Sequence, residues 1–405
     1  MRTLDDLTHD ELAVLVREFL LAGHLIDRAG MPQVIPRGID VMRDVAIDEW
    51  MGASPVYTKR MQRLLAFEGD TVEVAFKGMQ LDIGAPPEFL DFRYEIADDH
   101  HGSFHLAHCG ALMDVEPMGE EFVVAMCHHI EDPTFDATAW ATNPRMRMRP
   151  LHRPPREPSN RVPHCEWTVV VDPDAEPTPE PAAALRMGRT RAARMPLATY
   201  PATGDGAVDY SGPLAADLSF SRFSTATIRA ILDEVALQGH LLAMAFGAAV
   251  EDRLGTEAAA AAVVEQGTGA AGVAAGRLAR ALGLGPPVGD LATLLMIHPA
   301  FLPRSYIDWS VQVDRDTVHL RLGECPAIAE SGFESWITTL AAGHGGLLSA
   351  IASALDPRWV VRPDTSPWSW RVEWNEAALG TAVELPAVSL AELSAGTVFE
   401  FIRPV

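Results

Sequence analysis

The sequence predicts an α+β fold built from two tandem copies of one module, each with N-terminal helices followed by an antiparallel sheet. The main observation is a repeat. Residues 8–26 (THDELAVLVREFLLAGHLI) align without a gap with residues 224–242 (STATIRAILDEVALQGHLL), 216 positions later. Shorter matches follow in the same order, ending with residues 166–169 (EWTV) and 369–372 (SWRV). Because two copies are too few for a solenoid, we expect a pseudo-two-fold pair of modules.

These matches divide the chain into three parts. The first module covers residues 1–172 and contains most of the cysteine and histidine residues. Residues 173–219 begin with an acidic, proline-rich stretch (PDAEPTPEP), which is typical of an extended linker. The second module and a C-terminal extension cover residues 220–405, and this copy is chemically degenerate because nothing replaces Cys127.

The helices of the first module come before its sheet. Thr8 and Glu11 form a capping box in front of an apolar stripe at helical spacing, which predicts a helix through Ile26. Ser54-Pro55 predicts the cap and first residue of a helix that ends at Leu65. A further helix is expected over residues 71–81. In the second module, the alanine-rich residues 258–279 predict a pair of tightly packed helices.

Alternating polarity predicts the sheet of the first module. Residues 91–97 and 103–109 alternate on either side of the turn at residues 98–102, which is typical of a hairpin. Helices are expected over residues 119–130 and 135–142. Residues 145–150 and 165–171 then complete an antiparallel sheet as two further strands.

Composition excludes several classes of function. The net charge of −23 leaves no basic surface for nucleic acid or for an anionic membrane. The N-terminus shows no basic segment followed by an apolar core, so we expect no signal peptide. Four cysteines in so long a chain indicate reduced thiols, and the expected location is cytoplasmic.

The segment from Asp98 to Asp172 concentrates the reactive side chains, with three of the four cysteines and eight of the fourteen histidines. Thiolate and imidazole bind borderline-soft metals and attack electrophilic carbon. Strand alternation puts His105 and Cys109 on one face and His108 on the other. Helical spacing puts Cys127 and His129 beside the buried stripe of their helix, with His128 pointing away.

These positions predict a metal or thiol site. The candidate ligands fit zinc or iron, including an iron–sulfur cluster, and they are His105, Cys109, Cys127, His128, His129, His164 and Cys165. No C-x-x-C or H-E-x-x-H pattern supports them, so simple burial of the thiols stays open. Glu131 and Asp132 stand where the helix is expected to end. The macrodipole disfavours acids there, so one of them is expected to have a partner unless both are solvated.

Arginines follow the same helix. Arg145, Arg147 and Arg149 share one face of the expected strand, with Met146 and Met148 facing the core. Arginine binds carboxylates with a planar pair of donors, which favours an anionic small molecule as the substrate. Ion pairs with the chain's own acids are the alternative.

The order of these residues resembles the L-2-amino-thiazoline-4-carboxylic acid hydrolase-like family over residues 85–172. In that pattern a strand ends in Cys109, a helix begins at Gly119 and ends near Cys127, and Cys165 lies in a late strand. The resemblance implies hydrolysis of a C–N or C–S bond in a small amidine-like or thioester-like compound. The string Cys127–Pro133 and the duplication depart from the family pattern, which leaves the substrate open.

Together these patterns predict a cytosolic metal- or thiol-dependent hydrolase. Cys109 or Cys127 would be the nucleophile or a ligand, His129 and Glu131 would complete the catalytic set, and the arginines would hold an anionic substrate. An iron or iron–sulfur redox protein using the same residues is one alternative. A non-catalytic metal- or ligand-binding module is the other.

Overall fold

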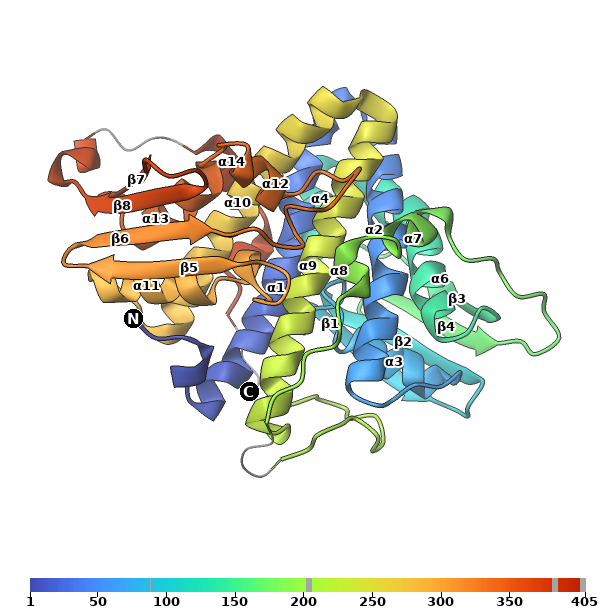
Figure 1. The fold of residues 1–405 in the computed structure, drawn as a ribbon. Helices are drawn as coiled ribbons and strands as arrows, with labels where there is room; N and C mark the ends of the chain where they lie inside the picture. Colours follow the sequence, from blue (N-terminus) through green and yellow to red (C-terminus); the bar gives the residue numbers. More distant parts are fainter. Residues whose placement is uncertain (88, 202–205, 381–384, 401–405) are drawn as a thin grey trace.

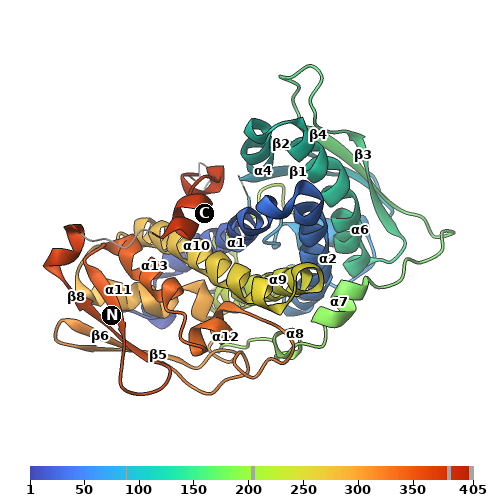
Figure 2. The ribbon, with the colours of Figure 1, turned by 90° about the horizontal axis from the view of Figure 1, so that it is seen from above.

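Four long helices form the centre of the computed structural model, which describes residues 1–87, 89–201, 206–380 and 385–400 (Figure 1). They are α1 (His9–Val34), α2 (Ile39–Leu64), α9 (Thr225–Leu254) and α10 (Thr256–Leu282). Helix α1 packs along α9 and α10, and α2 packs along α9. Two separate antiparallel sheets lie on opposite sides of these helices (Figure 2), so the fold is mixed α+β, as predicted.

Both sheets have four strands and the same order. The first sheet is β1-β2-β4-β3, formed by β1 (Leu90–Ile96), β2 (His101–Cys109), β3 (Met146–His152) and β4 (Cys165–Val171). The second is β5-β6-β8-β7, formed by β5 (Trp309–Asp314), β6 (Thr317–Leu322), β7 (Trp359–Pro363) and β8 (Ser369–Trp374). The strands expected in the first module are confirmed to within two residues.

Shorter helices connect these parts. Those of the first module are α3 (Val72–Met79), α4 (Gly110–Val115), α5 (Glu120–Val124), the π-helical turn η4 (Ala125–Ile130) and α6 (Glu131–Thr142). Residues 173–219 contain α7 (Ala182–Met187) and α8 (Arg191–Arg194). After them come α11 (Val288–Ile297), α12 (Trp336–Ala341), α13 (Gly346–Leu355) and α14 (Pro386–Ala391). None of the described helices has an apolar stretch long enough to cross a membrane.

Of two helix starts predicted from capping residues, one is confirmed and one is wrong. The capping box of Thr8 and Glu11 is confirmed, because each side chain accepts a hydrogen bond from the other residue's backbone N–H. The predicted start at Ser54-Pro55 is wrong, because α2 begins at Ile39 and runs through Pro55. Proline removes only one helical hydrogen bond, and residues on both sides of it are buried against α6 and α9. Packing therefore outweighs the local signal.

The expected helical pair over residues 258–279 is one continuous helix, α10. The glycines within α10 do not end the helix. They allow neighbouring segments to come close to it. A Cβ at Gly269 would lie 2.7 Å from the Ala387 carbonyl oxygen, and one at Gly267 would lie 2.8 Å from Trp336 Cβ. The small residues thus let α10 approach its neighbours closely.

Two buried ion pairs join the helices of the first half (residues 1–172) to those of the second half (residues 220–405). Arg60 on α2 binds Glu234 on α9 with two N–O distances of 2.7 and 2.8 Å. Arg277 on α10 binds Glu18 on α1 with distances of 2.7 and 3.2 Å. Each arginine also donates through Nη1 to backbone carbonyls of a later segment, those of Ala193 and Met195 for Arg60 and those of Gly396, Thr397 and Phe399 for Arg277.

Candidate functional site

A cavity of about 110 Å³ lies in the first half, between α1, α2 and the β1–β2 hairpin, with η4 and α6 closing it. Its walls combine aromatic and aliphatic side chains with an unusual number of polar ones. The polar lining residues are His24, Arg28, Tyr57, Asp82, Glu131, Thr134 and Thr138. We call this space the inner cavity.

Asp82 and Tyr57 form one side of the inner cavity. Helix α3 ends at Met79, and the turn after it brings Asp82 against α2. The Tyr57 hydroxyl and the Gly84 backbone N–H both donate to Asp82 Oδ1, each at 2.6 Å. Burial raises the pKa of Asp82 to about 6, which these two hydrogen bonds partly oppose. Asp82 is therefore ionised at neutral pH and can accept further hydrogen bonds.

His24 lies on α1 with only 5% of its surface exposed. Neither ring nitrogen has a hydrogen-bond partner among the described residues. The ring is 5.9 Å from that of Trp50 and 5.4 Å from that of Phe89, measured between centroids. Burial lowers the pKa of His24 to about 4, so the imidazole is neutral at pH 7. Buried polar groups are normally satisfied, so an unpartnered imidazole in a cavity wall indicates a missing ligand or water.

Asp27, Arg28 and Glu49 form a compact charged group beside His24. Arg28 Nε donates to Asp27 Oδ2 at 2.7 Å, and Trp50 Nε1 donates to Asp27 Oδ1 at 3.1 Å. Glu49 is wholly buried. Burial and the Asp27 carboxylate raise the pKa of Glu49 well above its usual value, which favours the neutral carboxyl. Arg28, the only arginine or lysine in the described lining, is thus already neutralised.

Glu131 enters the inner cavity from the start of α6. The π-helical turn before it widens the helix, a feature often found at functional sites. Glu131 Oε2 is buried with no partner among the residues described, and burial raises the pKa of Glu131 to about 8. Its neighbour Asp132 instead binds Arg153 at 2.5 Å. The two acids, which were expected at a helix end, thus lie where η4 passes into α6 within one continuous helical segment, and one of them has an arginine partner.

Cys109 lines the inner cavity, but not through the predicted strand face. Residues Leu106 and His108 pair with consecutive residues of β1, so β2 has a bulge at Ala107. A bulge moves the following side chains to the other face. Cys109 therefore shares the buried face with Leu106, while His105 pairs with Arg93 and Glu166 on the other face. The expected common face of His105 and Cys109 is wrong.

All three cysteines of the first half are buried thiols. Burial and the nearby Glu131 raise the pKa of Cys109 to about 12. The same causes raise the pKa of Cys127 and of Cys165. Thiols with raised pKa values are protonated at neutral pH and are poor nucleophiles.

The candidate histidines lie apart from the inner cavity. The π-helical turn changes the phase of the helix, so His129 is exposed, whereas His128 is half-buried with Nε2 2.7 Å from the Pro154 carbonyl oxygen. The expected placement of these two is therefore reversed. His164 is half-buried, with its ring centroid 6.3 Å from that of His108. Within the described part of the chain, no group of three or more His, Cys, Asp or Glu side chains could hold a metal ion.

Arg145, Arg147 and Arg149 bind the chain's own atoms. Arg145 Nε donates to the Ala175 carbonyl, and Arg147 Nη1 donates to the carbonyls of Pro144 and Met146. Arg149 pairs with Asp136 at 2.8 Å. Met146 and Met148 face the core as predicted. None of the three arginines lines the inner cavity as far as the described residues define it.

A second pocket of about 350 Å³ adjoins the inner cavity. Arg28, Trp50, Met126 and Ile130 line both spaces. The other walls of this pocket are mainly apolar and include Met31, Ile35, Met42, Met118, Phe122, Leu390 and Leu393. Met118, Leu390 and Leu393 are 42%, 41% and 79% exposed, so the pocket opens to solvent. We call it the outer pocket.

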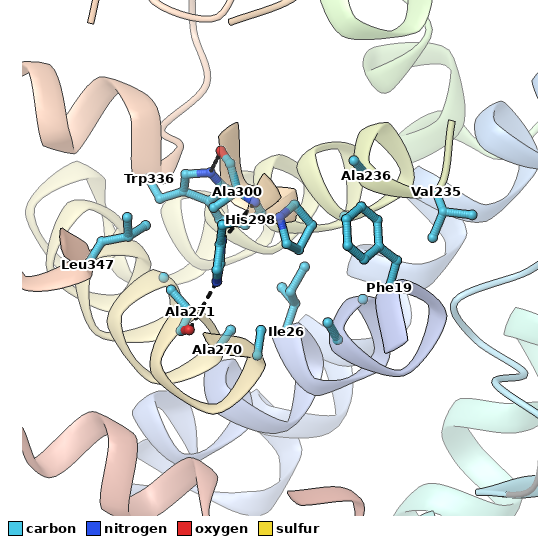
Figure 3. A pocket seen from close by; sticks show the side chains of 16 residues that line it. Phe19, Ile26, Val235, Ala236, Ala270, Ala271, His298, Ala300, Trp336 and Leu347 are labelled. Carbon is cyan, nitrogen blue, oxygen red and sulfur yellow. Dashed lines mark hydrogen bonds between the residues drawn. The ribbon is translucent and has the colours of Figure 1, made fainter. Parts of the chain in front are cut away.

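A different cavity lies where α1, α9 and α10 meet, and Figure 3 shows its lining. It is small, about 30 Å³, and mostly apolar. Its one imidazole, His298, is fully bonded: Nε2 lies 3.1 Å from the Ala271 carbonyl oxygen, and Nδ1 accepts from the Ala300 N–H. Trp336 Nε1 donates to the Ala300 carbonyl oxygen at 3.1 Å. This cavity therefore leaves a ligand little to bind.

Sequence reasoning missed most of the inner cavity. His24, Asp27 and Arg28 stand at helical spacing within a largely apolar stretch of α1 that follows Arg17 and Glu18. Glu49 and Tyr57 are buried on α2 in the same way. Polar residues within such a buried stripe were the available signal. No family model, no curated protein and no solved structure matches this chain.

Proposed function

We propose that the first half binds a small organic molecule in the inner cavity and that the outer pocket is the entrance. The observation that carries this proposal is the set of buried polar atoms facing the cavity without partners, namely both nitrogens of His24 and Oε2 of Glu131. Leaving such atoms unpaired costs about 1–3 kcal/mol each. A ligand that completes their hydrogen bonds would recover that free energy on binding.

We also propose that the two halves are copies of one module and that only the first kept a ligand site. The shared strand order and the two ion pairs that each join one half to the other support this proposal. The positions 216 or 217 residues after Arg28, Trp50 and Tyr57 hold Met244, Gly267 and Ala274. The polar lining thus has no counterpart at these positions of the second half.

Replacing Thr134 by leucine tests the binding proposal. Thr134 lines the inner cavity on α6, and Leu347 stands at the corresponding position of α13, each nine residues before the residue that caps its helix. Leucine would fill the space needed by a ligand. A library of small metabolites would be screened by thermal shift, and compounds that stabilise the native protein would be measured by calorimetry.

Thr134→Leu should abolish binding of such compounds without lowering Tm. Glu120→Gln, on the exposed start of α5, is the control and should bind as the native protein does. Ligands that bind Thr134→Leu unchanged, or a library without any hit, would contradict a site in the inner cavity.

A hydrolase is the second candidate, and the Asp82–Tyr57 pair favours it. A carboxylate ionised at neutral pH can accept a proton from water at its free oxygen Oδ2, and the Tyr57 hydroxyl that donates to Oδ1 holds the carboxylate in place. Asp82→Asn would then abolish turnover of a ligand found in the screen even at concentrations that saturate the variant. Full turnover by Asp82→Asn would rule out this role.

A metal centre and thiol catalysis remain predictions of the sequence. Elemental analysis and an absorption spectrum of the freshly purified protein test them together with the iron–sulfur alternative. Stoichiometric zinc or iron that is lost in Cys109→Ser or Cys127→Ser would support a metal site. Protein without metal and with unreactive thiols would leave the polar lining of the inner cavity as the binding chemistry.

A further inference from the structure

Resting on the proposed function, we infer that the ligand is a single-chain amphiphile with a primary ammonium head. Its head would lie in the inner cavity between Asp82, Glu131 and His24, and its apolar chain would lie in the outer pocket. Three features carry this inference: the hydrogen-bonding groups left over in the inner cavity, the aromatic walls around them, and the apolar space next to it.

Most hydroxyl donors of the inner cavity are already used. The Tyr57 hydroxyl donates to Asp82, and the Thr134 hydroxyl donates to the Ile130 carbonyl at 2.8 Å. The Thr138 hydroxyl shares hydrogen bonds with the Thr134 carbonyl and with Ser54. Arg28 is engaged by Asp27. An anionic head would therefore have to displace existing bonds to reach any donor other than the His24 ring N–H and the carboxyl proton of Glu131.

Several hydrogen-bond acceptors of the inner cavity, by contrast, have no partner among the described residues. Both hydrogen bonds to Asp82 go to Oδ1, which leaves Oδ2 for a ligand. Glu131 Oε2 has no partner in the described part of the chain, and it can accept once Glu131, whose pKa burial raises to about 8, gives up its proton beside a cation. Neutral His24 offers one acceptor and one donor nitrogen. A group with several N–H donors matches this inventory, and a primary ammonium has three. Its charge also complements the Asp82 carboxylate.

Aromatic rings complete the head site. Trp50, Tyr57, Phe92 and Phe135 line the inner cavity. The faces of such rings attract cations when they lie within about 6 Å of the charge. The volume of about 110 Å³ holds the equivalent of only three or four water molecules of about 30 Å³ each, so the head must be small.

The apolar lining of the outer pocket is the reason for proposing that the ligand has an apolar chain. Its lining is mainly aliphatic and aromatic, and four of its residues are the methionines Met31, Met42, Met118 and Met126. Unbranched, flexible methionine side chains adapt to a chain of variable shape. Met126 and Ile130 belong to η4 and also line the inner cavity. One molecule can therefore contact both spaces by passing these side chains.

Calorimetry with four small probes tests the inference on the full-length protein. The probes are octylammonium, octanoate, octanol and butylammonium, all used below their micelle concentrations. Octylammonium should bind at least roughly tenfold more tightly than octanol because only its head pairs with the free acceptors. Butylammonium should bind more weakly than octylammonium, and octanoate should not bind measurably.

Substitutions in the inner cavity and the outer pocket test where octylammonium binds. Asp82→Asn and Glu131→Gln should each weaken octylammonium by about tenfold or more, with Glu120→Gln as the matched control. Circular dichroism confirms that each variant is folded. Ala46→Phe, which narrows the outer pocket, should weaken octylammonium more than butylammonium.

Octanoate that binds as tightly as octylammonium, or octylammonium that binds Asp82→Asn and Glu131→Gln as it binds the native protein, would overturn the inference. Lack of octylammonium binding would overturn it as well. The binding proposal would survive these results if other ligands still lost affinity in Thr134→Leu. It would fall with the inference if no ligand did.

Discussion

His24 and His240 stand at matching positions of α1 and α9, 216 residues apart, and they meet different surroundings. Both are almost completely buried. His240 Nε2 lies 3.0 Å from the Leu302 carbonyl oxygen, and its ring packs against Tyr306 and Trp336. His24 has no partner of this kind in the described structure and instead borders the inner cavity. The same residue thus packs in the core in one half and borders a cavity in the other.

The residues near His24 are also more polar than those at the corresponding positions near His240. Asp27 and Arg28 correspond in position to Ala243 and Met244. Glu49, whose carboxyl is buried beside Asp27, corresponds to Gln266, another wholly buried side chain. Burial favours the neutral form of Glu49, and Gln266 is a neutral amide whose polar atoms, like those of Glu49, have no partner among the described residues. The charges that distinguish the first half are therefore those of Asp27 and Arg28. This comparison explains why chemistry is expected in one half only.

The largest loss of stability should follow from breaking either of the two ion pairs that join the halves. These pairs are the feature most alike in the two halves. Breaking a buried pair leaves an unpaired charge, so Arg60→Met and Arg277→Met should each lower the free energy of unfolding by about 3–5 kcal/mol. Urea unfolding measures both. A loss below about 1 kcal/mol, typical of exposed pairs, in either variant would end the argument that the pairs are equivalent.

Acid should destabilise both halves through their histidines. Burial lowers the pKa of His24 to about 4 and of His240 to about 3. The unfolded state, with an ordinary pKa near 6.5, therefore binds more protons than the folded state below that pH. Stability is full above pH 6.5 and falls as the pH drops, by about 2 kcal/mol per histidine between pH 7 and pH 5. Unfolding curves of His24→Leu and His240→Leu should each show a shallower acid loss than the native protein.

At pH 8 the same two variants should differ from each other. His240→Leu leaves the Leu302 carbonyl unpaired, which should cost about 1–2 kcal/mol. His24→Leu removes unpartnered nitrogens and should be neutral or stabilising in the absence of ligand. Equal losses in thermal unfolding would mean that His24 is also satisfied in solution, and the contrast between the halves would disappear.

Much of the fold could be predicted from the sequence. The capping box at Thr8 and the alternation in β1 to β4 depend on neighbours along the chain, so they survive in the structure. Pro55 was misinterpreted as the start of a helix, and the alanine-rich residues 258–279 were misinterpreted as two helices. Their effect depends on distant helices that pack against them, which no local pattern contains.

The site was harder to predict than the fold. The segment rich in cysteine and histidine contributes Cys109 and Glu131 to the inner cavity, whereas His24, Arg28, Tyr57 and Asp82 come from outside that segment. The bulge at Ala107 and the π-helical turn η4 shift the phase of side chains by one residue, which moved Cys109, His128 and His129 from their expected faces. Asp82 was not predicted, because its contact with Tyr57 joins residues 25 positions apart.

The smallest change in stability is expected when Arg147 is replaced. The sequence analysis predicted that Arg147 binds the substrate. Its guanidinium donates to the carbonyls of Pro144 and Met146 at 3.0 and 2.7 Å and lies outside the inner cavity lining. Hydrogen bonds from a half-buried side chain to nearby carbonyls can be replaced by water, so Arg147→Ala should change the free energy of unfolding by no more than about 0.5–1 kcal/mol. Ligands of the inner cavity should bind this variant with unchanged Kd, as calorimetry would measure. A selective loss of affinity for anionic compounds would instead support the arginine strand as the substrate site and would move the centre of recognition away from Asp82 and His24.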